Sequence, residues 1–157
     1  MKKFICLCIS LFSLSIAAQS ISEKDVLGSW KVVAITTPEL SVDMQTLEVT
    51  LTPETIEWAK KKNKSTEALK KDAVKNAMGY VNVTYTFNPK GIYIEKKADG
   101  KTRKAEYELT NSGGLNVVML YYPDEDVEDM YYVSYKIKQL YLEYDEAEVT
   151  LICEKTE

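Results

Sequence analysis

The sequence predicts a mostly β domain: an eight-stranded antiparallel up-and-down barrel, with a helical hairpin inserted between the first and second barrel strands. From Tyr80 onward, apolar and polar residues alternate with a period of two, which is typical of strands. Turn signals, such as those at residues 88–91 and 99–100, separate these strands at short intervals. Many short strands joined by tight turns favour a barrel, with a sandwich as the alternative.

The N-terminal segment has the three parts of a secretory signal. Lysines at positions 2 and 3 precede an apolar run over residues 4–16, and small residues follow up to Ala18. The run is shorter than the about 20 residues that a membrane-spanning helix needs. No cysteine directly follows it, as a lipid anchor would require. We therefore expect a signal peptide over residues 1–18, a secreted or periplasmic protein without a lipid anchor, and a mature domain over residues 19–157.

The composition argues against several classes of protein. The sequence has no His, which rules out Ser-His-Asp and Cys-His catalytic arrangements and disfavours the familiar zinc sites. Cys153 is the single cysteine after residue 18, and its alternation with Val149 and Leu151 indicates a buried, inert thiol. Neither a GxxxxGK[ST] loop nor a GxGxxG loop occurs. We therefore expect a protein that is not an enzyme and that uses no metal and no cofactor.

The expected mature domain is acidic. Removing the signal with its two lysines changes the net charge from −4 to −6, whereas nucleic-acid-binding domains carry a basic surface. No second apolar run is long enough to span a bilayer as a helix. We expect no nucleic-acid partner and no stable membrane insertion.

The first strand is expected from Ser29 to Thr36, and two helices are expected further along. Thr52-Pro53 supplies an N-cap hydroxyl and a proline at the first helical position, which together start a helix. Ser65 can cap a second helix, which Gly79 ends. We expect these helices to span about residues 53–78 and to form a lid over the barrel.

Seven strands are expected after the helices, so that the barrel has eight in all. Closure of a barrel removes the free strand edges along which sheets aggregate. An eight-stranded barrel has room for packed side chains or for one small ligand. The seven strands are expected over about residues 81–87, 92–95, 104–109, 115–122, 131–137, 140–144 and 149–153.

The start of the first strand and the end of the chain together resemble a known family. Gly28-Ser29-Trp30 matches the Gly-x-Trp of the first lipocalin strand, and the last two strands look like the closing hairpin of bacterial lipocalin-like domains. The chain thus resembles exported lipocalin-like proteins of the calycin group. The resemblance implies structural roles for Gly28, for Trp30 as a plug at the narrow end of the barrel, and for Lys155. This lysine stands where lipocalins carry an arginine that stacks on the tryptophan.

Tyrosine supplies most of the candidate ligand-binding residues. The chain has eleven, and each combines a flat apolar ring with a hydroxyl, as binding pockets require. Tyrosine also suits half-buried strand faces without any ligand. An error of one residue in phase would turn the whole set of a strand outward. The residues expected to face the interior and line a ligand site are Tyr85, Phe87, Tyr107, Met119, Tyr121, Tyr131 and Tyr135, together with Val133.

Most charged residues are expected on solvated surfaces. The helical segment carries seven lysines, which could attract an anionic ligand. The acidic loop over residues 124–129 lacks the layout of an EF-hand. Four glutamates fall on strand faces that we expect to be solvated, namely Glu95, Glu106, Glu108 and Glu143.

These observations support one leading function and one alternative. The leading hypothesis is an exported domain that binds a small apolar or amphipathic ligand inside the barrel. The alternative is a structural or protein-interaction module of the cell envelope, with a filled barrel and a partner protein held on its outer face.

Overall fold

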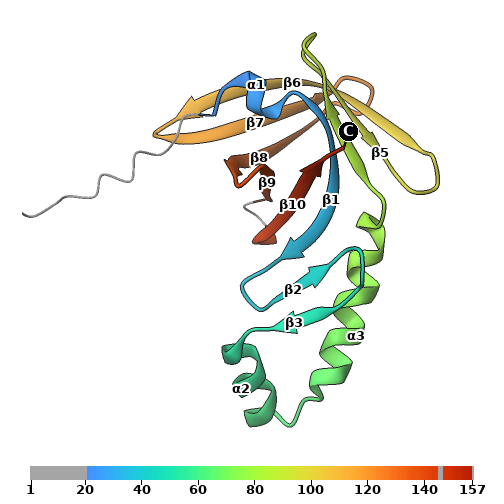
Figure 1. Ribbon diagram of the computed structural model, residues 1–157, viewed down its shortest axis with the longest axis vertical. Coiled ribbons are helices and arrows are strands. Elements are labelled where there is room, and N and C mark those ends of the chain that lie inside the picture. The colour runs from blue at the N-terminus through green and yellow to red at the C-terminus, as the bar shows by residue number, and fades with distance from the viewer. Residues whose placement is uncertain (1–20, 145–146, 157) are drawn as a thin grey trace, which may run out of the picture.

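A computed structural model describes residues 21–144 and 147–156 of the chain, and the predicted signal peptide lies outside these residues. Eight antiparallel strands form a closed barrel (Figure 1). Seven of them follow one another in chain order, and pairing of the last with the first closes the ring. The barrel strands are β1 (Gly28–Thr36), β4 (Thr84–Phe87), β5 (Ile92–Lys96), β6 (Thr102–Ser112), β7 (Leu115–Tyr122), β8 (Val127–Lys136), β9 (Gln139–Tyr144) and β10 (Val149–Lys155).

The pairing of β1 with β10 confirms the predicted closure of the barrel. Trp30 lies opposite Lys155 and Val32 lies opposite Cys153. The register then shifts between Val32 and Ala34, where one extra residue of β1 forms a bulge. A bulge strengthens the local twist and bends the strand, which helps a short sheet curl into a ring.

The segment between β1 and β4 contains more than the predicted helical hairpin. It begins with a β-hairpin formed by β2 (Leu40–Asp43) and β3 (Val49–Leu51). β2 pairs with the second half of β1, and β4 pairs with the first half of the same edge. The helices α2 (Pro53–Lys61) and α3 (Thr66–Ala77) therefore lie between β3 and β4, and not directly between two barrel strands.

The helices begin where their capping residues predicted. The Thr52 hydroxyl accepts a hydrogen bond from the Thr55 N–H, and the Ser65 hydroxyl accepts one from the Ala68 N–H. α3 packs its buried alanines, Ala73 and Ala77, toward the β2–β3 hairpin. The 3-10 turn η1 (Met78–Tyr80) then leads back to the barrel. Figure 1 shows the hairpin and both helices extending away from the barrel.

A short helix, α1 (Glu23–Val26), lies at the other end of the barrel, before β1. The sequence analysis did not predict it. In its capping box, the Asp25 carboxylate accepts hydrogen bonds from the backbone N–H and the hydroxyl of Ser22. Within the described part of the chain, no helix has the length and apolar character needed to cross a bilayer.

The direction of the side chains on β7 corrects one prediction. Val118, Leu120 and Tyr122 are buried in the interior, whereas Tyr121 is 40% exposed and Met119 shares its outer face. Met119 and Tyr121 therefore point away from the interior, contrary to the prediction. β7 is apolar on both faces, so alternation alone could not set its phase.

The side chains of β5 also face the opposite way from the prediction, which placed Glu95 on a solvated face. Tyr93 is 2% exposed and lies in the core, while Ile92 and Ile94 are half-buried. Ile92, Tyr93 and Ile94 are all apolar enough for the interior, and the residues of the neighbouring strands decide between the two faces. Tyr93 lies opposite Phe87 and Ala105, which are both buried.

Candidate functional site

The two ends of the barrel carry different chemistry. The tryptophan end contains α1, the turn over residues 88–91 and the C-terminal part of β10. The tyrosine end contains the turns over residues 97–101 and 123–126 and lies next to η1. Antiparallel strands bring alternate turns to the same end, so the sequence order alone places these segments together.

At the tryptophan end, the Trp30 side chain is fully buried. Its ring N–H donates a hydrogen bond of 2.6 Å to the carbonyl of Val26 in α1. Tyr135 meets the ring edge-on, with the ring centroids 6.1 Å apart. The Lys155 ammonium lies 5.4 Å from the Trp30 ring centroid. These contacts give Trp30 and Lys155 the positions that the sequence assigned to a plug and its cationic partner.

Gly28 allows this close approach. Its φ is +120°, a backbone conformation that residues with a side chain rarely adopt, and an added Cβ would lie 2.7 Å from Cε of Lys155. The Lys155 side chain therefore occupies the space that any other residue at position 28 would need.

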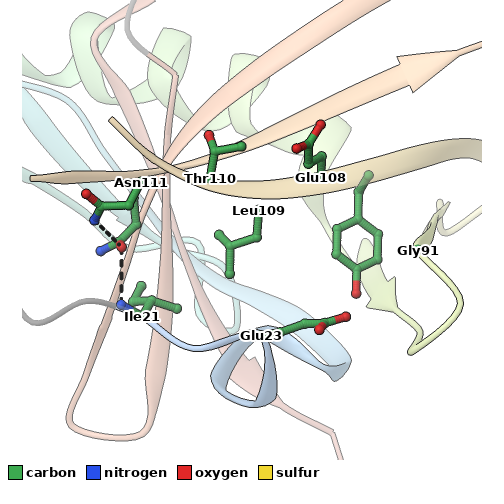
Figure 2. Close-up of a pocket in the computed structure, with 9 residues that line it drawn as sticks. Ile21, Glu23, Gly91, Glu108, Leu109, Thr110 and Asn111 are labelled. Carbon is green, nitrogen blue, oxygen red and sulfur yellow. Dashed lines mark hydrogen bonds between the residues drawn. The ribbon is translucent and has the colours of Figure 1, made fainter. Parts of the chain in front are cut away.

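A pocket of about 420 Å³ opens beside α1 at the tryptophan end. Figure 2 shows Ile21 and Glu23 on one side of it and the strand carrying Leu109 on the other. Tyr107 lines this pocket, but its hydroxyl donates a hydrogen bond of 2.9 Å to the Asn88 carbonyl. Burial, and then the charge of Glu23, raise the pKa of Tyr107. The Tyr107 hydroxyl thus holds the turn after β4.

At the tyrosine end, two buried tyrosines keep their hydroxyls unpaired. Tyr85 and Tyr93 are 4% and 2% exposed, and their rings stack with centroids 5.7 Å apart. Neither hydroxyl has a hydrogen-bond partner among the described residues, yet no buried side-chain polar atom in that part of the chain is without a partner. Both hydroxyl oxygens must therefore border space that water can reach.

Glu95 lies beside these tyrosines, which corrects its expected place on a solvated face. On the two neighbouring strands, Glu95 lies opposite Tyr85 of β4 and Arg103 of β6. Its side chain is only 16% exposed. The shift in phase that buries Tyr93 also turns Glu95 inward. Its carboxylate contacts the ammonium of Lys97 at 3.7 Å, and that lysine is half-exposed.

Five tyrosines near Glu95 have a raised pKa. Burial is the largest cause that raises each pKa, and the negative charge of Glu95 raises each one further. Rings from η1 and from four barrel strands thus converge on one carboxylate. They are Tyr80, Tyr85, Tyr93, Tyr122 and Tyr131.

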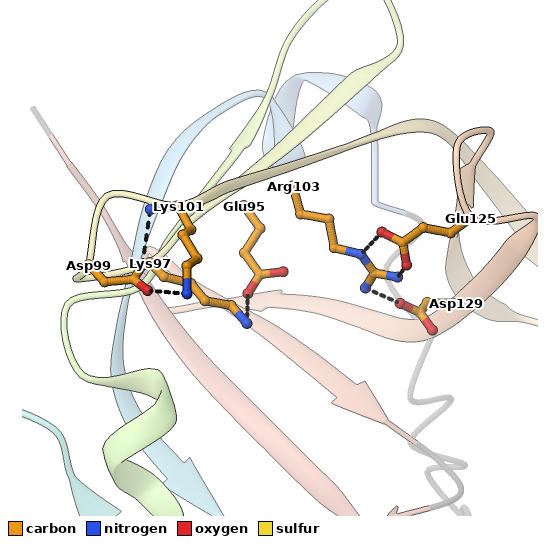
Figure 3. Close-up of polar contacts among 7 residues, drawn as sticks. All are labelled: Glu95, Lys97, Asp99, Lys101, Arg103, Glu125 and Asp129. Atoms are coloured by element: carbon orange, nitrogen blue, oxygen red, sulfur yellow. Dashed lines mark hydrogen bonds and ion pairs between the residues drawn. The ribbon is translucent and has the colours of Figure 1, made fainter.

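Arg103 is engaged by other partners at the rim of this end. Its guanidinium donates two hydrogen bonds to Glu125, at 2.6 and 2.8 Å, and one to Asp129 at 3.4 Å. The same group stacks on the Tyr122 ring, 3.5 Å from its centroid. Figure 3 shows Arg103 pointing toward Glu125 and Asp129 while Glu95 points toward Lys97. Arg103 therefore does not neutralise Glu95, its cross-strand neighbour.

The structure divides the predicted site residues among several places. Tyr85 and Tyr131 lie among the rings around Glu95, and Tyr107 and Tyr135 lie toward the tryptophan end. Phe87 lies between the two groups, in contact with Tyr93 and Tyr107. Met119 and Tyr121 lie on the outer face, as described above. Sequence reasoning missed three of the five rings around Glu95, those of Tyr80, Tyr93 and Tyr122, and also missed Glu95 and Arg103. Correct phases for β5 and β7 would have identified Tyr93, Glu95 and Tyr122.

Cys153 is buried below the tyrosine end, and burial raises the pKa of its thiol to about 12. Such a thiol is not ionised at neutral pH and is a poor nucleophile. Among the described residues, no three His, Cys, Asp or Glu side chains gather as a metal site requires.

Two further hollows lie outside the barrel. One, of about 480 Å³, is bordered by Met119, Tyr121 and three glutamates on the outer face of β6, β7 and β8. The other, of about 640 Å³, lies between the β2–β3 hairpin and the helices. Trp58, which is 47% exposed, lines it together with Leu40, Leu51 and Leu69. The sequence analysis did not single out Trp58.

The comparisons with known proteins support the fold. The sequence matches no family model and no curated protein. The crystal structure of a DUF4847 family protein from Bacteroides vulgatus ATCC 8482 matches with a TM-score of 0.50 at 11% sequence identity. The match covers 88% of this chain and the whole of that one. At this identity the likeness shows a shared fold, and it does not confirm the lipocalin resemblance.

Proposed function

We propose that this chain is an exported, lipocalin-like binding protein that takes up an amphipathic ligand through the tyrosine end of its barrel. The ligand places its polar group among the tyrosine hydroxyls and its apolar part against the interior of the barrel. Lipocalin-like proteins use an eight-stranded barrel in this way, with one end blocked and the other open to a ligand. Here the buried Trp30 and α1 block one end.

The observation that carries the proposal is the pair of unpartnered hydroxyls on Tyr85 and Tyr93. Both hydroxyl oxygens border space that water can reach, so a ligand group that accepts or donates hydrogen bonds can take the place of that water. The core of the barrel is apolar and suits the rest of an amphipath, with Val118, Leu142 and Leu151 among its buried side chains.

Native mass spectrometry of the protein purified from its own cells tests the proposal. We expect a non-covalent adduct on the natural protein. In a Tyr85→Phe, Tyr93→Phe double variant, which keeps both rings and removes both hydroxyls, we expect the adduct to fall about tenfold or more, given about 1 kcal/mol for each hydrogen bond. A Tyr121→Phe variant is the matched control, because Tyr121 is on the outer face.

Two results would contradict the proposal. One is a natural protein that carries no adduct and binds none of decylamine, decanol and decanoate. The other is an adduct that persists unchanged in the double variant. Circular dichroism shows whether the double variant is folded. We expect it to fold, because Tyr and Phe have nearly the same shape.

A specific observation also favours the alternative, a protein-interaction module. Tyr121 and Met130 are exposed on β7 and β8, next to the half-buried Met119, and Glu106, Glu108 and Glu128 border this patch. Methionine and tyrosine are enriched where proteins meet, and the acidic border suits a partner segment that is both apolar and basic. A Tyr121→Ala, Met130→Ala variant would then lose an envelope partner that the natural protein captures. The Tyr85→Phe, Tyr93→Phe variant would keep that partner.

A further inference from the structure

The charges at the tyrosine end indicate which kind of polar group the ligand carries. Glu95, Glu125 and Asp129 form ion pairs there with two cations, Lys97 and Arg103, while Lys101 pairs with Asp99 in the same hairpin turn. Arg103 is bound by Glu125 and Asp129, which leaves Glu95 with Lys97 alone. Because half of the Lys97 side chain is exposed, solvent screens this pair and a ligand cation can replace the lysine.

The rings around Glu95 suit a cation as well. The face of an aromatic ring carries negative potential and attracts ammonium groups, most strongly where water is excluded. Tyr85 and Tyr93 stack on one side of Glu95 along the sheet, and Tyr131 packs against Tyr144 with centroids 5.6 Å apart. A phenol oxygen also accepts a hydrogen bond from an ammonium N–H. Aromatic rings beside a carboxylate are the elements of an ammonium-binding site.

We propose that the ligand is an amphipath with a cationic amine head, held between the Glu95 carboxylate and the rings of Tyr85 and Tyr93. The inference rests on the proposed function and adds the chemical class of the ligand. The head displaces the Lys97 ammonium from Glu95, and an alkyl or similarly apolar tail enters the barrel. The Glu95 carboxylate, whose ion-pair partner Lys97 is half-exposed, would repel an anionic head, so such a head should bind most weakly.

Isothermal titration calorimetry at pH 7 with three probes of equal chain length tests this assignment. Decylamine is cationic, decanol is neutral and decanoate is anionic. We expect the folded natural protein to bind decylamine about tenfold more tightly than decanol, and decanoate least of the three. Glu95→Gln should weaken decylamine binding to the level of decanol and leave decanol unchanged. Glu143→Gln, which removes an exposed carboxylate from the outer face of β9, should change neither.

The possible outcomes separate the two proposals. If decanol or decanoate binds as tightly as decylamine, or if Glu95→Gln binds decylamine as tightly as the natural protein, the cationic head is wrong and the binding function stands. If none of the three probes binds, and the protein from its own cells carries no adduct, the proposed function fails as well. If Glu143→Gln weakened decylamine binding as much as Glu95→Gln does, the effect would come from net charge in general. That result would also overturn the assignment to Glu95.

Discussion

Lys155 lies across the ring of Trp30, with its ammonium 5.4 Å from the ring centroid, at the register position where β1 and β10 close the barrel. The contact joins the two ends of the described domain: Trp30 is the third residue of its first barrel strand and Lys155 the last residue of its final one. Closure and plugging of the barrel are therefore one local arrangement. It depends on Gly28, whose missing side chain leaves room for the lysine.

A Gly28→Ala variant tests this arrangement. The alanine must adopt a φ of +120° and must displace the Lys155 side chain, so we expect the free energy of unfolding to fall by about 1–2 kcal/mol or more. Gly79→Ala is the control, since an added Cβ there meets nothing within 4 Å and the backbone has no positive φ. Urea denaturation measures both. Equal stability of Gly28→Ala and the natural protein would show that Lys155 does not need this space.

The ion pair of Arg103 and Glu125 predicts a dependence of stability on pH. The hydrogen bonds from Arg103 lower the pKa of Glu125 below its usual value of 4.5. A carboxyl group whose pKa is lower in the folded state stabilises the fold above its unfolded pKa, and loses this effect as pH falls through the folded one. We therefore expect stability to decline as the pH falls below about 4.5.

Replacing the carboxyl group isolates its share of this decline. Glu125→Gln should make the loss of stability between pH 5 and pH 3 shallower, whereas Glu128→Gln, on the outer face of β8, should not. Denaturation midpoints across this range give the comparison. If the stability of Glu125→Gln fell with pH as steeply as that of the natural protein, the ion pair of Arg103 and Glu125 would contribute nothing to stability in solution.

The burial of Cys153 predicts slow reaction with thiol reagents. Its thiol is not ionised at neutral pH, and Leu140 and Val32 flank it on the neighbouring strands. In a chain lacking residues 1–18, where it is the single cysteine, we expect iodoacetamide to react at least about a hundredfold faster in guanidinium than in buffer. Rates measured by mass spectrometry would be similar in both conditions if the interior around Cys153 were open to small reagents.

Lys97 competes with the proposed ligand head for Glu95, so removing it should help the ligand. Lys97→Gln is expected to bind decylamine a few-fold more tightly, because no ammonium has to be displaced from the carboxylate. Lys101→Gln is the matched control in the same hairpin, since Lys101 pairs with Asp99 at 3.1 Å. Calorimetry showing weaker or unchanged affinity in Lys97→Gln would argue that the head does not replace this lysine.

The sequence predicts the barrel well because its turns and alternation are local signals. Eight strands, their closure and both helix starts follow from features such as Thr52, Ser65 and the turn residues after Phe87. The β2 strand was missed because it is four residues long and is stabilised by pairing with the far half of β1. That pairing depends on tertiary context, which single-sequence patterns do not contain.

The candidate site was harder to predict than the fold. On β5 and β7 both faces carry apolar or aromatic residues, so the phase depends on what the neighbouring strands place beside them. The sequence therefore placed Tyr121 inside and Glu95 outside, and the structure reverses both. The pairing of Arg103 with Glu125, 22 residues further along the chain, also has no signature in the sequence.

Nuclear Overhauser contacts between decylamine and the protein test the central claim most directly. In a sample with labelled aromatic rings, the protons next to the amine should show contacts to Tyr85 and Tyr93, and the tail protons should show contacts to Val118 or Leu142. The groove beside Trp58 offers the ligand a competing apolar site. Contacts to Trp58 alone, with none to Tyr85 or Tyr93, would contradict a ligand site at the tyrosine end.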